Sequence, residues 1–184
     1  MGRKISEAIF KLKEAMAEEK IDPTKGLGND LFLFSTTLAP CVTIDLLIHD
    51  RHGRLLLAWR DDVYNGQGWH FPGGCVRLHE SLEERVQRSA MQELGSSVIF
   101  EKTPIKISED IITKPREEVQ NKLERSHNIS FLYLCEMPAG YVVPDQYAGT
   151  ELQWFDHYPE NMLETHIRQY GDVLERFFKG EWNR

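Results

Sequence analysis

The chain has 184 residues, of which 41% are hydrophobic and 28% are charged, a composition typical of one compact globular domain. Its formal net charge of -7, with lysine and arginine scattered along the chain, argues against nucleic acid as a partner. The longest apolar runs are too short to cross a membrane, and the N-terminus lacks the apolar core of a signal peptide, so we expect a cytoplasmic protein that does not bind membranes.

The first part of the chain is predicted to be an extension. Apolar residues recur at helical spacing from Ile5 to Met16, so an amphipathic helix is expected over 4–20, followed by a linker rich in helix breakers. We therefore divide the chain into an N-terminal helical extension with its linker, 1–35, and a main domain, 36–184. The apolar stripe of the helix can pack on the main domain or on a second subunit, and both options stay open.

The main domain begins with a predicted β-hairpin and a well-bounded helix. Apolar and polar residues alternate along 40–60, and the sequence DRHG interrupts them as a turn. A helix is expected from about 81 to 94. Ser81 and Glu84 have the spacing of a capping box at its start, and Gly95 supplies the stop.

The rest of the domain is predicted to be mostly strands. Strands are expected at 69–76, 98–107, 129–137 and 151–157, and a terminal helix is expected at 163–177. A polar stretch at 114–126 is typical of a loop. Strands that dominate the middle, with one helix embedded and one at the end, predict an α/β fold.

The three cysteines give no sign of a disulfide framework or a structural zinc site, because they are odd in number and form no Cys-x-x-Cys pair. Free thiols are therefore expected. Cys75 has no histidine placed by sequence to activate it, so it is predicted to be a small buried side chain rather than a nucleophile.

The segment GGCVRLHESLEERVQRSAMQELG, which starts at Gly73, carries the candidate chemistry. It places a glycine pair in a loop before the helix, then Glu80, Arg88 and Glu93. A divalent cation that bridges two phosphates prefers hard oxygen ligands, and the Gly73 carbonyl and the Glu93 carboxylate can supply two of them. Arg88 can clamp Glu80 or a phosphate oxygen in bidentate fashion. Trp69 precedes the segment closely enough to line such a site.

This segment resembles the Nudix box, which runs Gly, five residues, Glu, seven residues, then Arg-Glu-aliphatic-x-Glu-Glu-x-Gly. Six residues fall on it in register: Gly74, Glu80, Arg88, Ala90, Glu93 and Gly95. Ser89 and Gln92 stand where the usual box has metal-binding glutamates, and Ser96 replaces its final aliphatic residue. The resemblance to Nudix hydrolases implies an α/β/α sandwich around a mixed β-sheet, and a hydrolase that depends on Mg²⁺ or Mn²⁺.

The same losses, with Met before x-Glu-Leu-Gly, are similar to the GDP-mannose mannosyl hydrolase branch of the family. The runs VTIDLLI, LAWR and GWHFPGG also resemble that branch. The resemblance implies a homodimer whose substrate is a nucleoside diphosphate sugar, cleaved at the sugar C–O bond into nucleoside diphosphate and free sugar. The losses fit this reaction, because one cation and arginines can neutralise a departing diphosphate, and the anomeric carbon needs a less activated water.

By matching position, the resemblance implies that Arg60 binds the leaving diphosphate, with Asp45 beside it. A buried carboxylate on an apolar strand requires a partner, and Arg60 can be that partner. Arg88 would support the box, while the arginine that follows the glycines in the branch is here Cys75. The implied metal ligands are Gly73, Glu93 and Gln146.

The general base is not assigned by the resemblance. The branch places a histidine directly after its metal-binding glutamine, whereas Tyr147 stands there in this chain. The remaining local candidates are Asp145, Glu151 and His127, and His127 ranks first because an imidazole titrates near neutral pH. Two other functions stay open. One is a pyrophosphohydrolase of another nucleoside-diphosphate compound, and the other is a catalytically inactive domain that binds a nucleotide.

Overall fold

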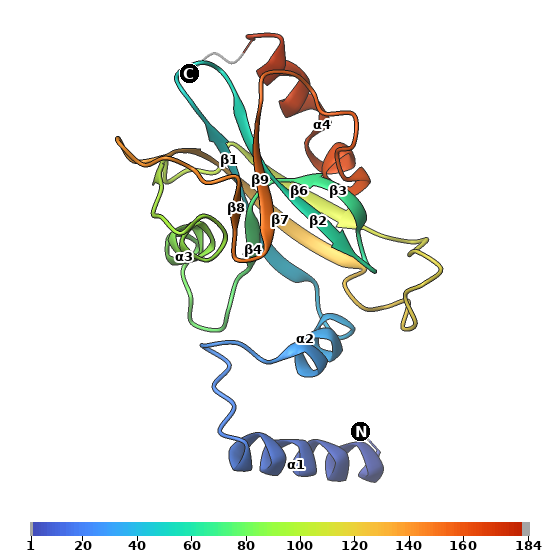
Figure 1. The fold of residues 1–184 in the computed structure, drawn as a ribbon. Coiled ribbons are helices and arrows are strands. Elements are labelled where there is room, and N and C mark those ends of the chain that lie inside the picture. Colours follow the sequence, from blue (N-terminus) through green and yellow to red (C-terminus); the bar gives the residue numbers. More distant parts are fainter. Residues whose placement is uncertain (1, 182–184) are drawn as a thin grey trace.

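A mixed β-sheet forms the centre of the structure (Figure 1). The computed structural model describes residues 2–181, and within them the sheet runs in the order β5-β7-β1-β2-β9-β8, while β3 pairs with β2, β4 with β1 and β6 with β7. The strands are β1 Cys41–His49, β2 Leu55–Asp62, β3 Gly66–His70, β4 Gly73–Cys75, β5 Ile99–Phe100, β6 Lys106–Ile111, β7 His127–Glu136, β8 Gln146–Tyr147 and β9 Thr150–Phe155.

Two helices cover opposite faces of this sheet, as Figure 1 shows. The four helices of the described chain are α1 Arg3–Glu18, α2 Asn29–Thr36, α3 Leu82–Leu94 and α4 Glu164–Phe178. Val86 and Leu94 of α3 belong to one buried cluster, and Tyr170 and Leu174 of α4 belong to the other. Because the sheet lies between two apolar layers, the predicted α/β/α sandwich with a mixed sheet is confirmed.

Strand β1 is the spine of the domain. It runs parallel to β7 over its whole length and antiparallel to β2 and β4. Ile44 and Leu46 contribute to the cluster under α3, whereas Leu47 contributes to the cluster under α4. A strand buried on both faces carries polar residues only where they have partners, so Asp45 on β1 marks a special position.

The strand predicted at 69–76 is in fact two strands. Strand β3 pairs with β2, and β4 pairs with β1, with Phe71 and Pro72 between them. Pro72 has no N–H to donate to a ladder, which favours a break at this point. Its carbonyl accepts a hydrogen bond from the Leu46 N–H at 2.8 Å. The break therefore carries the chain from β2 to β1 and sets Gly73 opposite Asp45.

Three further expectations need correction. The strand predicted at 98–107 is divided into β5 and β6, with Pro104 between them. Helix α2 is not predicted; it begins at the end of the linker and runs to Thr36, and its eight residues make too few turns to show a helical period. The strand predicted at 151–157 is β9, and it forms a hairpin with the unpredicted strand β8, which carries Gln146; the turn residues Ala148 and Gly149 both have positive φ, as in a type I′ turn.

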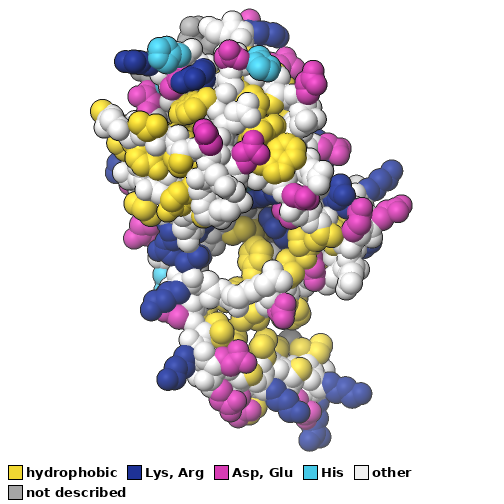
Figure 2. Space-filling view, viewed as in Figure 1, with side chains coloured by type: hydrophobic (Ala, Val, Ile, Leu, Met, Phe, Trp, Pro, Cys, Tyr) yellow, Lys and Arg dark blue, Asp and Glu magenta, His cyan; other side chains and the backbone are white. Residues whose placement is uncertain are grey.

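The N-terminal helix stands apart from the sheet. None of the residues of α1 is buried, and apolar side chains such as Ile5, Ile9 and Phe10 are exposed. In Figure 1, α1 lies beyond α2 and well away from the strands. The boundary between 1–35 and 36–184 stays a prediction. No helix of the described residues is long and apolar enough to cross a membrane. Figure 2 shows acidic and basic side chains interspersed over the face it presents.

Helix α3 begins and ends where the sequence predicts. The Ser81 hydroxyl accepts a hydrogen bond from the Glu84 N–H at 3.2 Å, and the Glu84 carboxylate accepts one from the Ser81 N–H at 2.8 Å. Gly95 closes the helix with φ 71°, a conformation that glycine adopts without strain. The capping box and the glycine stop are therefore confirmed, and they fix the register of the helix that carries Glu93.

The cap gives a direct stability prediction. Replacing Ser81 with Ala removes one half of the capping box and should cost about 1 kcal/mol. For a chain of this size that loss lowers the melting temperature by roughly 2–4 °C. Thermal unfolding followed by circular dichroism measures it, with the exposed Ser97→Ala as the matched control. An equal melting temperature for Ser81→Ala and Ser97→Ala would contradict the role of the cap.

Candidate active site

The glycine pair of the box lies against the middle of β1. Asp45 and Gly73 are register partners across β1 and β4. A Cβ atom added to Gly73 would lie 2.3 Å from the Ile44 carbonyl oxygen and 2.8 Å from Asp45 Oδ1. No side chain fits in that space, so glycine is required at 73 for the close approach of the two strands.

Asp45 is a buried carboxyl whose partner the sequence did not reveal. Its side chain accepts a hydrogen bond from the Tyr170 hydroxyl at 2.7 Å. Burial raises the pKa of Asp45 to about 6, and the Tyr170 hydrogen bond and the nearby Arg60 charge oppose that rise. The expected pairing with Arg60 is not what the structure shows, because Arg60 Nε lies 3.5 Å from Asp62 Oδ2. Tyr170 lies on the buried face of the terminal helix α4, so its spacing indicates a core residue and not a partner of Asp45.

Glu93 on α3 faces the same glycine. Its carboxylate accepts a hydrogen bond from the Gly73 N–H at 3.3 Å. Burial raises the pKa of Glu93 to about 7, while the Arg60 charge and the Gly73 hydrogen bond lower it. Asp45 also contributes to the rise through its negative charge. The structure thus gathers Asp45, Arg60, Gly73 and Glu93, which the sequence predicted to act together.

Arg88 and Glu80 form the internal support of the box. Arg88 Nε lies 3.0 Å from Glu80 Oε1, and the side chain of Glu80 is only 2% exposed. Glu80 also accepts a hydrogen bond from the Arg77 N–H at 2.8 Å. Of the two partners considered for Arg88, the structure shows Glu80, held in an ion pair that ties the loop after the glycines to α3.

The two replaced positions of the box carry no carboxylate. Ser89 is fully buried, and Gln92 accepts a hydrogen bond from Arg85 at 3.3 Å. Arg85 is itself buried and its guanidinium packs against Gly74. At positions 89, 92 and 93, the helix therefore offers a metal ion one carboxylate, that of Glu93.

The cysteines are free thiols in the described chain, as predicted. Cys41 Sγ and Cys75 Sγ lie 3.1 Å apart at the start of β1 and the end of β4. Cys135 is buried elsewhere on β7. Cys75 is thus packed against a second thiol, with no histidine among its hydrogen-bond partners.

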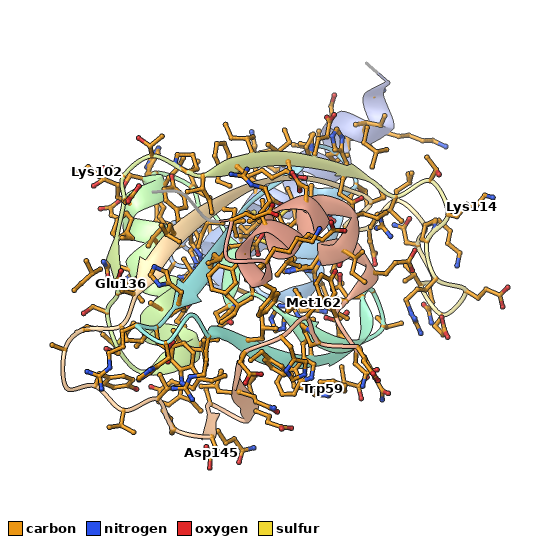
Figure 3. All side chains as sticks on the ribbon, turned by 90° about the horizontal axis from the view of Figure 1, so that it is seen from above. Trp59, Lys102, Lys114, Glu136, Asp145 and Met162 are labelled. Carbon is orange, nitrogen blue, oxygen red and sulfur yellow. The ribbon has the colours of Figure 1, made fainter. Side chains whose placement is uncertain are left out.

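Arg60 lies in the walls of two cavities. The Glu93 cavity has a volume of about 670 Å³, and its walls include Arg60, Glu93 and Gln146. The Asp45 cavity is smaller, about 90 Å³, and its walls include Asp45, Arg60 and Gly73. Figure 3 shows Trp59, which also lines the Glu93 cavity, and Asp145, next to Gln146, on the same side of the molecule. Gln146 is therefore brought together with Glu93 by the β8–β9 hairpin.

Two predicted site residues lie elsewhere. Trp69 is buried in the core beneath α4, 5.1 Å from the Trp59 ring and 4.9 Å from the Phe155 ring. It borders neither cavity, and Trp59 is the tryptophan that does. His127 begins β7, where its Nε2 lies 2.9 Å from Glu109 Oε1, and it also borders neither cavity. The structure does not bring these two side chains to Glu93.

One functional candidate was missed by the sequence reading. His70 is 4% exposed and belongs to the wall of the Glu93 cavity. It follows Trp69 on β3, so its side chain points to the opposite face of the sheet. That alternation was the available signal, but a histidine in a strand is usually a structural residue and carries no motif.

The residues present fit one hard divalent cation. Among residues 2–181, no three His, Cys, Asp or Glu side chains cluster as a metal site. The Glu93 cavity instead offers the Glu93 carboxylate and the Gln146 side-chain amide, and Gly73 lies against Glu93. Such an oxygen donor set suits an ion that binds one or two carboxylates and takes its remaining ligands from substrate phosphates and water.

Comparison with solved structures shows the same fold. The MutT protein from Methanosarcina mazei Go1 superimposes with a TM-score of 0.55 at 20% identity, over 78% of this chain and 97% of that chain. A UDP-X diphosphatase gives a TM-score of 0.53 at 18% identity, over 98% of this chain and 84% of that chain. A MutT NUDIX hydrolase from Burkholderia pseudomallei gives 0.51 at 24% identity, over 77% and 97%.

Sequence comparison gives one partial relative and a family. The low-salt glycan biosynthesis protein Agl8 of Haloferax volcanii is 35% identical over 80 residues, which are 43% of this chain and 50% of that protein. This chain therefore matches about half the length of that relative. The NUDIX domain family matches residues 39–177, a span that includes the box with Glu93 and also Asp45 and Arg60. The chain belongs to the NUDIX domain family.

Proposed function

We propose that this protein is a Mg²⁺-dependent hydrolase of a nucleoside diphosphate sugar similar to GDP-mannose. The reaction releases nucleoside diphosphate and free sugar by cleavage of the sugar C–O bond. The observation that carries the proposal concerns the three helix positions where the usual box has metal-binding glutamates. Glu93 keeps its carboxylate and lines a cavity together with Arg60, while Ser89 and Gln92 offer no carboxylate.

This donor set suits C–O cleavage better than attack on phosphorus. A leaving diphosphate needs its charge neutralised, and Arg60 with one cation held near Glu93 supplies positive charge to it. An anomeric carbon that develops positive charge accepts water with less activation than an anionic phosphorus does. Attack on phosphorus gains most from a cluster of carboxylates that holds several cations, and α3 lacks that cluster.

Two further parts of the proposal have separate support. The printed name of Agl8, a glycan biosynthesis protein, supports a sugar-containing substrate. The bound ion is Mg²⁺, or Mn²⁺ in its place, because both accept the oxygen donors of Gly73, Glu93 and Gln146. A homodimer is proposed as well, and the exposed apolar stripe of α1 supports it as a surface for a second copy.

The first test removes the Glu93 carboxylate, which is proposed to bind Mg²⁺. Glu93→Gln should lower kcat/KM by at least about 10³-fold and abolish the dependence on Mg²⁺, because the cation contributes several kcal/mol to the transition state. Release of free sugar from a panel of nucleoside diphosphate sugars measures the effect. Glu101→Gln, at an exposed glutamate beyond β5, is the matched control. Full turnover by Glu93→Gln would refute the metal role.

A second test identifies the bond that is cleaved. Hydrolysis in ¹⁸O-labelled water, followed by mass spectrometry of both products, should place the label in the sugar and none in the nucleoside diphosphate. Label in a phosphate group would instead assign the pyrophosphohydrolase reaction. Stabilisation of the fold by nucleotide without any turnover across the panel would assign a catalytically inactive binding domain.

A third test separates the two arginines. Arg60→Ala removes the cation shared by both cavities, so the dissociation constant for GDP should rise by about tenfold or more, measured by isothermal titration calorimetry. Arg88→Ala leaves the buried Glu80 without its ion-pair partner, which should destabilise the fold by about 1–3 kcal/mol and change GDP affinity less. If Arg88→Ala weakened GDP binding more than Arg60→Ala, these assignments would be reversed.

A further inference from the structure

His70 has one ring nitrogen in use and one without a protein partner. Its Nδ1 lies 2.7 Å from the Ala58 carbonyl oxygen. Because a carbonyl oxygen can only accept, Nδ1 carries the proton and Nε2 keeps its lone pair. Nε2 is buried, and within residues 2–181 no protein atom forms a hydrogen bond with it. The tautomer thus leaves Nε2 as a free acceptor, and His70 is one of the residues that line the Glu93 cavity.

The surroundings keep this acceptor unprotonated. Burial holds the pKa of His70 well below its ordinary value, and the positive charge of Arg60 and the neighbouring His166 act in the same direction. The rings of His70 and His166 are 5.9 Å apart. Arg60 is also the cation that a bound diphosphate would neutralise. Substrate binding therefore removes one cause of the low pKa and makes His70 a stronger base in the complex.

A purely structural role leaves Nε2 unexplained. A buried polar atom without a partner destabilises the fold, and an apolar side chain at this position of β3 would avoid that cost. The cavity wall that holds His70 also holds Glu93 and Gln146, the residues proposed for the metal. A lone pair that is fixed by a backbone hydrogen bond, on a residue that lines that cavity, has the properties of a proton acceptor.

We propose that His70 is the general base of the hydrolysis. Its Nε2 accepts a proton from the water whose oxygen forms the new bond to the anomeric carbon. The C–O bond to the diphosphate breaks, and its electron pair stays on the diphosphate oxygen. His70 becomes an imidazolium that still donates from Nδ1 to Ala58, and later releases the proton to solvent. This assignment rests on the function proposed above.

The other candidates for the base are less well placed. His127 is held by Glu109 at the start of β7, outside both cavities. The ring of Tyr147 packs against Gly95, where an added Cβ would lie 2.6 Å from it. Glu151 borders the Glu93 cavity but is exposed on β9. His70 combines burial, a fixed tautomer and a place in the wall of the cavity that Glu93 also lines.

The test uses His70→Ala and His70→Asn in the full-length chain with the nucleoside diphosphate sugar that the wild type cleaves best. Asn keeps an N–H that can donate to Ala58, so it protects the test if His70→Ala fails to fold. Loss of a general base should lower kcat by about 10²–10⁴-fold and leave KM within a few-fold of wild type. His157→Ala, at an exposed histidine, is the control and should retain wild-type kcat.

Chemical rescue separates a base from a structural residue. Azide attacks the anomeric carbon without needing a base, so either His70 variant with azide should form a glycosyl azide and regain turnover. A folded variant that keeps wild-type kcat, or one that azide does not rescue, would overturn the assignment. So would a ¹⁴N coupling to bound Mn²⁺ that disappears in His70→Asn, because it would make His70 a metal ligand. If the wild type cleaves no nucleoside diphosphate sugar, the proposed function fails, and the base assignment with it.

Discussion

The close approach of β4 to β1 at Gly73 is the constraint on which the site depends. Gly73 lies so near Ile44 and Asp45 that a side chain cannot be accommodated. Its N–H in turn donates a hydrogen bond to the Glu93 carboxylate, which links the start of β4 to the last turn of α3. Because Pro72 moves the chain from β2 to β1, the same segment also carries Trp69 into the core and His70 into the cavity wall.

Charge at this point is balanced around Arg60. Two buried carboxyls, Asp45 and Glu93, have raised pKa values because burial disfavours their ionised forms, and Arg60 opposes the rise in both. A divalent cation would offset the cost of their burial, because its positive charge favours the ionised forms of both carboxyls. Because Glu93 is the one carboxylate at the metal positions of the box, we expect the substrate's own phosphate oxygens to complete the coordination of that cation.

The elements that depend on residues close together in the chain could be predicted from the sequence. The hairpin β1–β2, the capping box of α3, the stop at Gly95 and the register of Glu80, Arg88 and Glu93 depend on neighbours in the chain. The partners of Asp45 and His70 come from distant segments, since Tyr170 is on α4 and Ala58 is on β2. Such pairings follow from packing of the whole sheet, which spacing along the chain does not encode. The sequence therefore predicts roles for His127 and Trp69 that their places in the fold do not support.

The central claim is that the cation site is completed by the substrate's diphosphate. Calorimetric titration of Mg²⁺ into the wild-type protein, alone and with saturating GDP, tests it most directly. The account predicts weak binding alone and one ion bound at least about tenfold more tightly when GDP is present, which corresponds to about 1.4 kcal/mol of coupling. Mg²⁺ binding that is equally tight with and without GDP, once binding to free GDP is subtracted, would contradict it.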